Sequence, residues 1–350
     1  MGQDAVVRTL RNALAGETLG HAYLFSGLRG VGKTTVARLL AKAVNCEQGP
    51  TPSPCGECQV CTEIVAGASL DVVELDGASN RGIDDVRELR ELLRYRPTRD
   101  RYRVIIIDEV HMLTREAFNA LLKSLEEPPP YILFIFATTE RHKVPGTILS
   151  RCQQLEFRPV ATDLISDHLQ RIAKHESFAM TVGAAGMIAR AAEGSVRDGL
   201  SLVDQLRAFS GDQIDEDAVA AVLGVLPFEQ VAQLIQKLAG GETSTALSLL
   251  RDELVAGHDC TVLFQEAGRM LRTLLHLSLD PELEPSLTEE HRKLLLAIAQ
   301  PLGSSALARM LGLWLEQEHL LRAGERVGDT VLLPQRDARH PRLAPGRSCT

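Results

Sequence analysis

Short apolar runs recur along the first part of the chain and alternate with longer amphipathic segments. The runs at residues 104–107 and 132–137 are almost continuously apolar, which is typical of strands buried on both faces of a parallel sheet. Two further runs, at residues 22–25 and 70–75, also have the length of strands. Because strand-like and helix-like segments alternate up to about residue 160, the pattern predicts a three-layer α/β domain.

One helix of this region has clear sequence limits. Thr114 is a suitable N-cap, and three consecutive prolines at residues 128–130 would end the helix. Its apolar positions repeat with helical spacing: Ala117, Phe118, Leu121, Leu122 and Leu125. The pattern therefore predicts a helix with one buried face.

Strand signals stop after Pro159, and the rest of the chain is predicted to be helical. We expect a domain at residues 1–160, a small helical domain at 161–223 and a second helical domain at 224–333. The last stretch, 334–350, contains Pro, Arg, Gly and Ser without periodicity, and it is predicted to be a disordered tail or the start of a linker.

Composition narrows the class of protein. The chain has 350 residues, of which 45 % are hydrophobic, enough to build sizeable cores. No apolar run approaches the roughly 20 residues of a membrane span, and the N-terminus has no signal-peptide pattern, so a cytoplasmic protein without a membrane partner is expected. The net charge of −8 means that any contact with DNA must come from a local basic surface.

The segment after the first predicted strand fits a phosphate-binding P-loop. Residues 27–34 read Gly-Leu-Arg-Gly-Val-Gly-Lys-Thr and precede a helical run. Gly27, Gly30 and Gly32 let backbone N–H groups close around phosphate oxygens, and the helix N-terminus adds a favourable dipole. We expect Lys33 to reach the β- and γ-phosphates and Thr34 to ligate Mg²⁺, with Thr35 beside it. The alternative is a glycine-rich turn that carries Lys-Thr by chance.

Two acids follow the predicted strand at residues 104–107. Asp108 is expected to hold Mg²⁺, directly or through water, and Glu109 to orient and polarise the attacking water. The alternative is an acidic first turn of the next helix. Because the acids occur together with a P-loop, an ATP site is predicted.

Four of the seven cysteines are clustered as Cys46-x8-Cys55-x2-Cys58-x2-Cys61. Four thiolates at this spacing suit a closed, structural Zn²⁺ site in a reducing compartment. An iron–sulfur cluster and four unliganded thiols are the alternatives. The other three cysteines, Cys152, Cys260 and Cys349, are isolated in the sequence.

Arginine is dense between residues 81 and 103. Arg87, Arg90 and Arg94 are spaced i, i+3, i+7, so they are predicted to share one helical face, and the apolar stripe is formed by Ile83, Val86, Leu89 and Leu93. The face could present arginine to a phosphate backbone, or it could be a solvated face paired with Glu88 and Glu91.

Taken in order, these segments resemble a known family. Beside the P-loop, the cysteines and the acids, the resemblance rests on residues 21–27, 76–84, 119–129, 137–139 and Ser150-Arg151-Cys152. The chain is similar to the AAA+ ATPase core of bacterial DNA polymerase III clamp-loader gamma/tau subunits. The resemblance implies an α/β P-loop AAA+ domain with an inserted zinc module at about residues 46–61, followed by a helical lid domain and a helical collar domain.

The resemblance also implies residue roles. Thr138 or Thr139 would be sensor 1, Arg197 would be sensor 2 and reach the subunit's own nucleotide, and Arg151 would be an arginine finger acting in trans on a neighbour's ATP. Surface salt bridging is the alternative for both arginines. Family members begin with a basic-aromatic segment that helps hold the adenine, and this sequence starts directly at Met1-Gly2-Gln3. The two interpretations are a reduced nucleotide affinity and a misassigned start codon. The long tail that distinguishes tau from gamma is also missing from the sequence.

The resemblance implies a pentameric homo- and hetero-oligomeric ring with delta-like and delta-prime-like subunits, which uses ATP, Mg²⁺ and Zn²⁺ to place a sliding clamp on primed DNA. Another AAA+ DNA motor and a scaffold that binds nucleotide without hydrolysis are the rival interpretations. The four-cysteine insert argues against the first rival. Intact Lys33, Thr34, Asp108 and Glu109 argue against the second.

Overall fold

The computed structural model describes residues 1–16, 18–256, 258, 260–284, 287 and 289–322. The chain divides into two compact units, Met1–Asp215 and Glu216–Thr350. The predicted tail at 334–350 and the end of the predicted third domain lie outside the described residues, and the domain limits stay a prediction.

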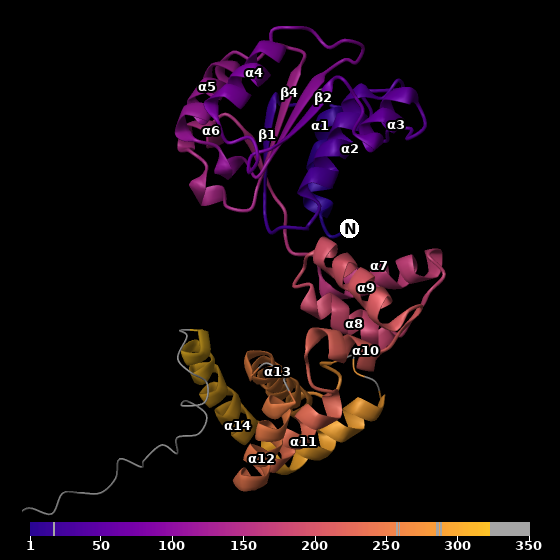
Figure 1. Cartoon of the computed structure of the whole chain (residues 1–350), viewed down its shortest axis with the longest axis vertical. Coiled ribbons are helices and arrows are strands. Elements are labelled where there is room, and N and C mark those ends of the chain that lie inside the picture. The colour runs from indigo at the N-terminus through magenta and orange to yellow at the C-terminus, as the bar shows by residue number, and fades with distance from the viewer. Residues whose placement is uncertain (17, 257, 259, 285–286, 288, 323–350) are drawn as a thin grey trace, which may run out of the picture. The chain divides into compact units, whose positions relative to one another are not determined.

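The first unit is built on a five-stranded parallel sheet (Figure 1). The strand order is β2-β3-β4-β1-β5. The strands are β1 (Ala22–Ser26), β2 (Val72–Asp76), β3 (Arg103–Asp108), β4 (Ile132–Thr138) and β5 (Gln153–Glu156). The four apolar runs of the sequence coincide with β1 to β4, and the interior strands β1, β3 and β4 are almost wholly buried.

Helices cover both faces of this sheet, which gives the three layers that the sequence predicts (Figure 1). One face packs against α1 (Asp4–Ala15), α2 (Lys33–Asn45) and α3 (Gln59–Ala66). The other packs against α4 (Ile83–Leu92), α5 (Arg115–Glu126) and α6 (Gly146–Leu149). Successive strand residues alternate between the two cores, so that Phe25 enters one core and Leu24 the other.

The predicted helix after Thr114 is α5, and its N-cap is as expected. The Thr114 hydroxyl accepts a hydrogen bond from the Ala117 N–H at 3.2 Å. Ala117, Phe118, Leu121 and Leu125 are buried, while Leu122 is half-buried against the same core. The helix ends at Glu126, just before the three prolines.

Two expectations about secondary structure need correction. The structure has strands after Pro159, because β6 (Ala179–Met180) pairs in parallel with β7 (Gln213–Ile214) between the helices α7 (Thr162–His175), α8 (Val182–Ala191) and α9 (Val196–Ser210). Two-residue strands are too short to show a period of two. The arginine stripe does not share one helical face either, since α4 ends at Leu92 and Arg94 lies beyond it, where it pairs with Glu91 at 3.0 Å.

The second unit is helical in its described part. Its helices are α10 (Glu216–Leu223), α11 (Phe228–Ala239), α12 (Thr243–Val255), α13 (Cys260–Leu279) and α14 (Glu289–Arg322). Trp314 of α14 stacks on Phe264 of α13 with ring centroids 4.3 Å apart, and its indole N–H donates to the Phe264 carbonyl.

One stretch of α14, Glu289–Gln317, has the length and mean hydropathy, 1.4, of a membrane span. Core helices have the same properties. This stretch is broken at Gly303, where φ is 71°, two residues after Pro301. Leu295, Ala299 and Leu307 on either side of the break are buried in the core of the unit, which favours a pair of core helices.

Candidate functional site

The carboxyl ends of three neighbouring strands carry the predicted nucleotide-binding residues. The sheet places β4 between β3 and β1. The P-loop follows β1, Asp108 ends β3 with Glu109 directly after it, and Thr138 ends β4 with Thr139 directly after it. Because the carboxyl ends of parallel strands lie at one edge of a sheet, three segments that are distant in sequence meet there.

The P-loop is shaped by glycines with positive φ. Gly27, Gly30 and Gly32 have φ values of 146°, 75° and 101°, which L side chains rarely adopt. A Cβ on Gly27 would lie 2.3 Å from the carbonyl oxygen of Phe157. Gly32 is the N-cap of α2, so the free N–H groups of the first helical turn face the loop.

Lys33 is folded into this loop. Its side chain is buried, and Nζ donates hydrogen bonds to the carbonyl oxygens of Gly27 and Leu28, both at 2.8 Å. Burial lowers the pKa of Lys33, while the nearby carboxylates of Glu109 and Asp108 act in the opposite direction. An ammonium in this position can exchange its carbonyl partners for phosphate oxygens.

The Thr34 hydroxyl donates to Asp108 Oδ2 at 2.6 Å, which joins the start of α2 to the end of β3. The other Asp108 oxygen accepts the Glu109 N–H at 2.9 Å. A hydroxyl and a carboxylate in contact are oxygen donors of the kind that Mg²⁺ takes. Thr35, the next residue of α2, is exposed.

Glu109 is held in a left-handed conformation, with φ 44°. Its carbonyl packs against Gly77, where a Cβ would lie only 2.7 Å away. Glu109 Oε2 accepts hydrogen bonds from the Thr139 N–H at 3.2 Å and from the Thr139 hydroxyl at 3.0 Å. The carboxylate is therefore held at the sheet edge by bonds that it can exchange.

Thr138 at the end of β4 and Thr139 directly after it differ in their surroundings. Thr138 is fully buried, and its Oγ1 accepts the Glu140 N–H at 3.0 Å and lies 3.0 Å from His111 Nδ1. Thr139 is half-buried and contacts Glu109. Of these two hydroxyls, that of Thr139 faces the acid.

Arg197 is brought to the P-loop by the helical segment that follows the sheet. The N–H groups of Val196 and Arg197, at the start of α9, donate to the Gly30 carbonyl at 3.1 and 3.4 Å. The Arg197 charge contributes to lowering the pKa of Lys33. A Cβ on Gly30 would lie 2.0 Å from Ser195 Oγ. The glycine at this position is therefore needed for close approach.

Arg151 contacts residues on the other side of the sheet from the P-loop helix α2. Its guanidinium pairs with Glu126 at 2.6 Å and donates to the Thr147 carbonyl at 2.8 Å. Both partners belong to the α5 and α6 side of the sheet, on the opposite face from the P-loop helix α2. Among the described residues, no hydrogen bond or ion pair joins Arg151 to its own P-loop.

The four clustered cysteines converge at the far end of α2. Their sulfur atoms all lie within 4.8 Å of one another, and the sulfurs of Cys46 and Cys55 are 3.6 Å apart. Backbone N–H groups of Cys55, Cys58 and Cys61 each donate to the sulfur of the preceding cysteine, at 3.4 to 3.5 Å. Tetrahedral zinc with bonds of about 2.3 Å needs sulfurs roughly 3.8 Å apart, so the donor set fits such an ion.

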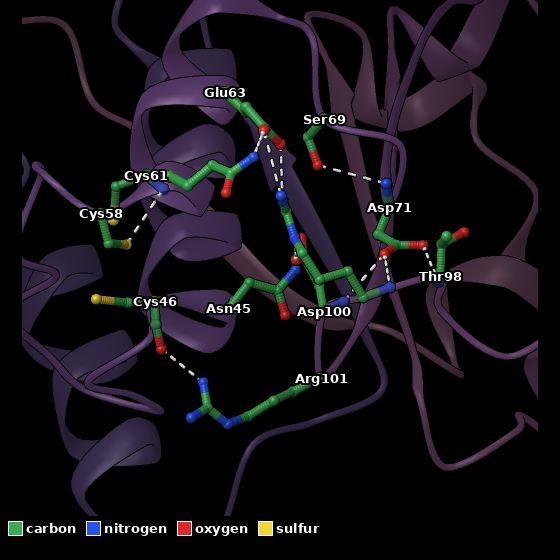
Figure 2. A network of polar contacts seen from close by, with 12 residues as sticks. Asn45, Cys46, Cys58, Cys61, Glu63, Ser69, Asp71, Thr98, Asp100 and Arg101 are labelled. Atoms are coloured by element: carbon green, nitrogen blue, oxygen red, sulfur yellow. Dashed lines mark hydrogen bonds and ion pairs between the residues drawn. The ribbon is translucent and has the colours of Figure 1, made fainter.

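A polar network ties this cluster to the chain that leads into β3 (Figure 2). Asn45, the last residue of α2, exchanges two hydrogen bonds of 2.9 Å with the backbone of Tyr102. Arg101 donates to the Cys46 carbonyl at 2.5 Å, and Arg99 pairs with Glu63 of α3 at 2.7 Å.

The same chain segment is anchored on Asp71, which precedes β2. The Asp71 carboxylate accepts the backbone N–H groups of Thr98, Arg99 and Asp100 at 2.7 to 3.1 Å, and these bonds lower its pKa against the opposing effect of burial. The cysteine module is thus fixed to β2 and β3 by side chains that no local motif identifies.

Three family comparisons together match most of the chain. Residues 2–161 match the family "DNA polymerase III, delta subunit", residues 164–212 match "DNA polymerase III clamp loader subunit, ATPase lid domain", and residues 214–323 match "DNA polymerase III subunits gamma and tau domain III".

Individual relatives are similar to the chain over the same region and are subunits of the same enzyme. The chain is 43 % identical over 284 residues to the DNA polymerase III subunit tau of Bacillus subtilis, covering 81 % of this chain and 50 % of the relative. It is 43 % identical over 281 residues to subunit tau of Escherichia coli, covering 80 % and 44 %. The chain thus spans about half the length of the curated relatives it matches. Among solved structures, the RuvB Holliday junction branch migration motor of Thermotoga maritima is similar with a TM-score of 0.48 and 21 % identity, over 77 % of this chain and 88 % of that one.

Proposed function

The chain belongs to the gamma/tau family of DNA polymerase III clamp-loader subunits, with an AAA+ ATPase fold, and from this premise we propose that it binds and hydrolyses ATP with Mg²⁺. The observation that supports hydrolysis most is the meeting of Lys33, Thr34, Asp108 and Glu109 at one sheet edge. A scaffold that only binds nucleotide would need no acid at the position of Glu109.

Each residue has a separate task in the proposed reaction. Lys33 leaves the Gly27 and Leu28 carbonyls to contact the β- and γ-phosphates. Thr34 and Asp108 would hold Mg²⁺, and the ion would neutralise charge on the phosphate oxygens. Glu109 orients the attacking water and accepts its proton as the water oxygen bonds to the γ-phosphorus, while the bond from the γ-phosphorus to the β–γ bridging oxygen breaks and ADP leaves.

We propose Thr139 as sensor 1, because its hydroxyl is half-buried and contacts Glu109, whereas Thr138 is buried and hydrogen-bonded internally. A γ-phosphate that attracts the Thr139 hydroxyl would release Glu109. Arg197 is proposed as sensor 2, since its backbone already contacts Gly30 of the P-loop.

For Arg151 we propose action on a neighbouring subunit's ATP. Its partners lie on the α5 and α6 side of the sheet, and its planar guanidinium suits phosphate oxygens. The experiment mixes Arg151→Ala chains with Lys33→Ala chains in the assembled complex. Hydrolysis should recover at interfaces where an intact Arg151 faces an intact P-loop. No recovery in assemblies known to contain such interfaces would leave Arg151 as a surface partner of Glu126.

We propose that the four cysteines hold one structural Zn²⁺, because their four sulfurs lie within 4.8 Å of one another and four thiolate ligands would leave no position open for catalysis. An iron–sulfur cluster is the competing occupant. Metal analysis of protein purified without chelators should find one zinc and no iron per chain.

The proposed partners are delta-like and delta-prime-like clamp-loader subunits in a pentameric ring, a sliding clamp and primed DNA, in the bacterial cytoplasm. Arg87, Arg90 and Arg94 are candidates for the DNA contact. Replacing all three with Ala should weaken binding of primed DNA by the assembled complex, and each lost phosphate contact should flatten the salt dependence by about 0.9 in log–log slope. An unchanged slope would favour a solvated face.

The direct test measures Mg²⁺-dependent ATP hydrolysis by the chain alone and with partner subunits, clamp and primed DNA. We expect the full set of partners to stimulate hydrolysis. Stimulation by DNA alone, without a clamp, would favour another AAA+ DNA motor, and nucleotide binding without hydrolysis in any combination would favour the scaffold.

A further inference from the structure

A glutamine side chain at the start of α1 holds the joining segment, residues 157–160, which leads from β5 to α7. Gln3 is 7 % exposed, and its side-chain amide donates to the Arg158 carbonyl at 2.7 Å. The Gln3 side-chain oxygen accepts the Arg158 N–H at 3.2 Å. One side-chain amide therefore satisfies both polar groups of a backbone residue 155 positions away.

Gln3 is itself fixed to the sheet through α1. It is the N-cap residue of this helix, and its carbonyl accepts the Val7 N–H at 3.0 Å. Val6, Leu10 and Leu14 of α1 are buried in the core that covers one face of the sheet. Because Gln3 stands on this rigid support, its two hydrogen bonds restrain the joining segment.

The first residue of the joining segment is in contact with the start of the P-loop. The Phe157 N–H donates to the Ser26 carbonyl at 2.7 Å, and the Phe157 ring is buried against Phe25. The Phe157 carbonyl lies so close to Gly27 that a Cβ on this glycine would be 2.3 Å away. The sheet therefore holds the segment up to the residue before Arg158, and Gln3 holds it from there.

The end of the joining segment is in contact with the residue that leads into α9. The Val160 N–H donates to the Gly194 carbonyl at 3.0 Å. Gly194 has a φ of 88°, and a Cβ on it would lie 2.5 Å from the Cβ of Pro159. Three residues later, the Arg197 N–H donates to the Gly30 carbonyl of the P-loop at 3.4 Å. A continuous series of short contacts thus leads from Gln3 to Arg197.

We propose that Gln3 is a positioning residue for nucleotide binding: by fixing the joining segment, it holds Gly194 and thereby keeps Arg197 beside the P-loop. Without the amide, both backbone groups of Arg158 lose their partners, and the segment that contacts Gly194 is no longer restrained. Gln3 then acts on the nucleotide through Arg197 and not by touching it. This inference rests on the proposed binding of ATP and on Arg197 as sensor 2.

Gln3→Met tests the role of the amide, because methionine has a similar length but lacks the amide donor and acceptor. The matched control is Gln170→Met, since the Gln170 amide of α7 also bonds to the backbone, at the Thr181 carbonyl at 3.0 Å. The affinity of the full chain for a fluorescent, non-hydrolysable ATP analogue is measured in both variants. Gln3→Met should weaken binding about fivefold or more, and Gln170→Met should stay within about twofold of the wild-type protein.

A double-mutant cycle with Arg197→Ala distinguishes positioning from direct contact. If Gln3 acts through Arg197, adding Gln3→Met to Arg197→Ala should weaken binding by less than about twofold. If Gln3 contacts the nucleotide itself, the loss should be the same with and without Arg197.

A second measurement needs no nucleotide. Hydrogen exchange of the peptide that contains the Arg197 N–H, followed by mass spectrometry, should be about tenfold faster in Gln3→Met than in Gln170→Met. A glutamine that only stabilises the fold would give the two variants equal exchange at this peptide. Where Arg197→Ala binds the analogue too weakly for the cycle, the exchange measurement decides.

The outcomes separate this inference from the proposed function. Weaker binding in Gln3→Met that disappears in the Arg197→Ala background, together with faster exchange at Arg197, would support the role of Gln3. Unchanged affinity in Gln3→Met, an equal loss in both backgrounds or equal exchange in Gln3→Met and Gln170→Met would overturn it while leaving ATP binding intact. Failure of the wild-type protein to bind the analogue, alone and with partner subunits, would overturn both.

Discussion

The two ends of α2 carry two different kinds of site. At its N-terminus, Lys33 and Thr34 make hydrogen bonds to the Leu28 carbonyl and to Asp108 that a bound nucleotide and cation can replace. At its C-terminus, about 20 Å away over 13 residues, Cys46 joins three other thiols in a closed cluster. The contacts at the N-terminal end can be replaced by contacts with a ligand, whereas the thiols at the C-terminal end form a permanent structural cluster.

The difference extends to how each end is connected to the rest of the domain. The N-terminal end gathers groups from β1, β3, β4 and α9, all through contacts that ligand binding can alter. The C-terminal end is fixed to the chain before β3 through Asn45 and Arg101 (Figure 2). A rigid support at one end of a helix lets the other end keep its position while ligands come and go.

The largest effect on stability is expected from removing one cysteine of the cluster at the C-terminal end of α2. Cys58→Ala removes one ligand and leaves three thiols that hold a metal poorly, so we expect loss of the metal and of at least ~3 kcal/mol of unfolding free energy, or about 6–12 °C in Tm. Metal analysis measures the loss of the metal, and thermal unfolding measures the change in Tm. Cys152→Ala removes a thiol outside the cluster and should keep the metal. A Cys58→Ala protein that retains full metal content and Tm would mean that the cluster is not a closed site.

A smaller effect, on nucleotide binding, is expected at Gly30, where Ser195 before α9 lies close to the P-loop. Gly30 and Gly67 both have φ near 70°, so an Ala at either position costs about 1–2 kcal/mol in backbone strain. Only at Gly30 would the added Cβ meet Ser195, because nothing lies within 4 Å of a Cβ at Gly67. Binding of a fluorescent ADP analogue should therefore weaken about tenfold in Gly30→Ala and little in Gly67→Ala. Equal affinities in the two variants would show that the lid contact does not shape the nucleotide site.

Two side chains that link α2 to neighbouring segments should differ in their contribution to stability. Asn45 is buried and bonds both polar groups of the Tyr102 backbone, so Asn45→Ala should cost about 1–3 kcal/mol. Arg38, which lies on the same helix as Asn45, makes a two-bond ion pair with Glu74 of β2 but is half-exposed, so Arg38→Ala should cost no more than about 1 kcal/mol. Urea unfolding measures the loss of unfolding free energy in both variants. A larger loss in Arg38→Ala than in Asn45→Ala would contradict the rigid attachment of the C-terminal end of α2.

The sequence predicts the two ends of α2 to different degrees. The cysteines lie within residues 46–61, so their spacing alone indicates a common site, and the family resemblance is confirmed by the comparisons. The P-loop and the acids were also identifiable, because each is a short motif after a strongly apolar strand. The strand order that joins them, and hence the contact between Thr34 and Asp108, depends on packing between segments 74 residues apart.

Residues that act through long-range contacts left no local signal. His111, Glu140, Asn45 and Asp71 look like ordinary surface residues in the sequence, yet each has buried or bridging contacts in the fold. The edge strand β5 was missed for a related reason, since its Gln153 and Gln154 are exposed and give no apolar run. Arg94 was assigned to a helix that ends before it, because a helical spacing can continue past the last helical residue.

The central claim is that the N-terminal end of α2 and the acids of β3 hydrolyse ATP, and one paired measurement tests it most directly. ATP binding and turnover are measured together in Lys33→Ala and Glu109→Gln within the assembled complex. Lys33→Ala should lose binding, because the phosphates lose a buried positive charge. Glu109→Gln should bind ATP within about twofold of wild-type protein and lose turnover by about 100-fold or more, because only activation of water is removed. Equal loss of binding in both variants, or turnover at the wild-type rate in Glu109→Gln, would contradict the account.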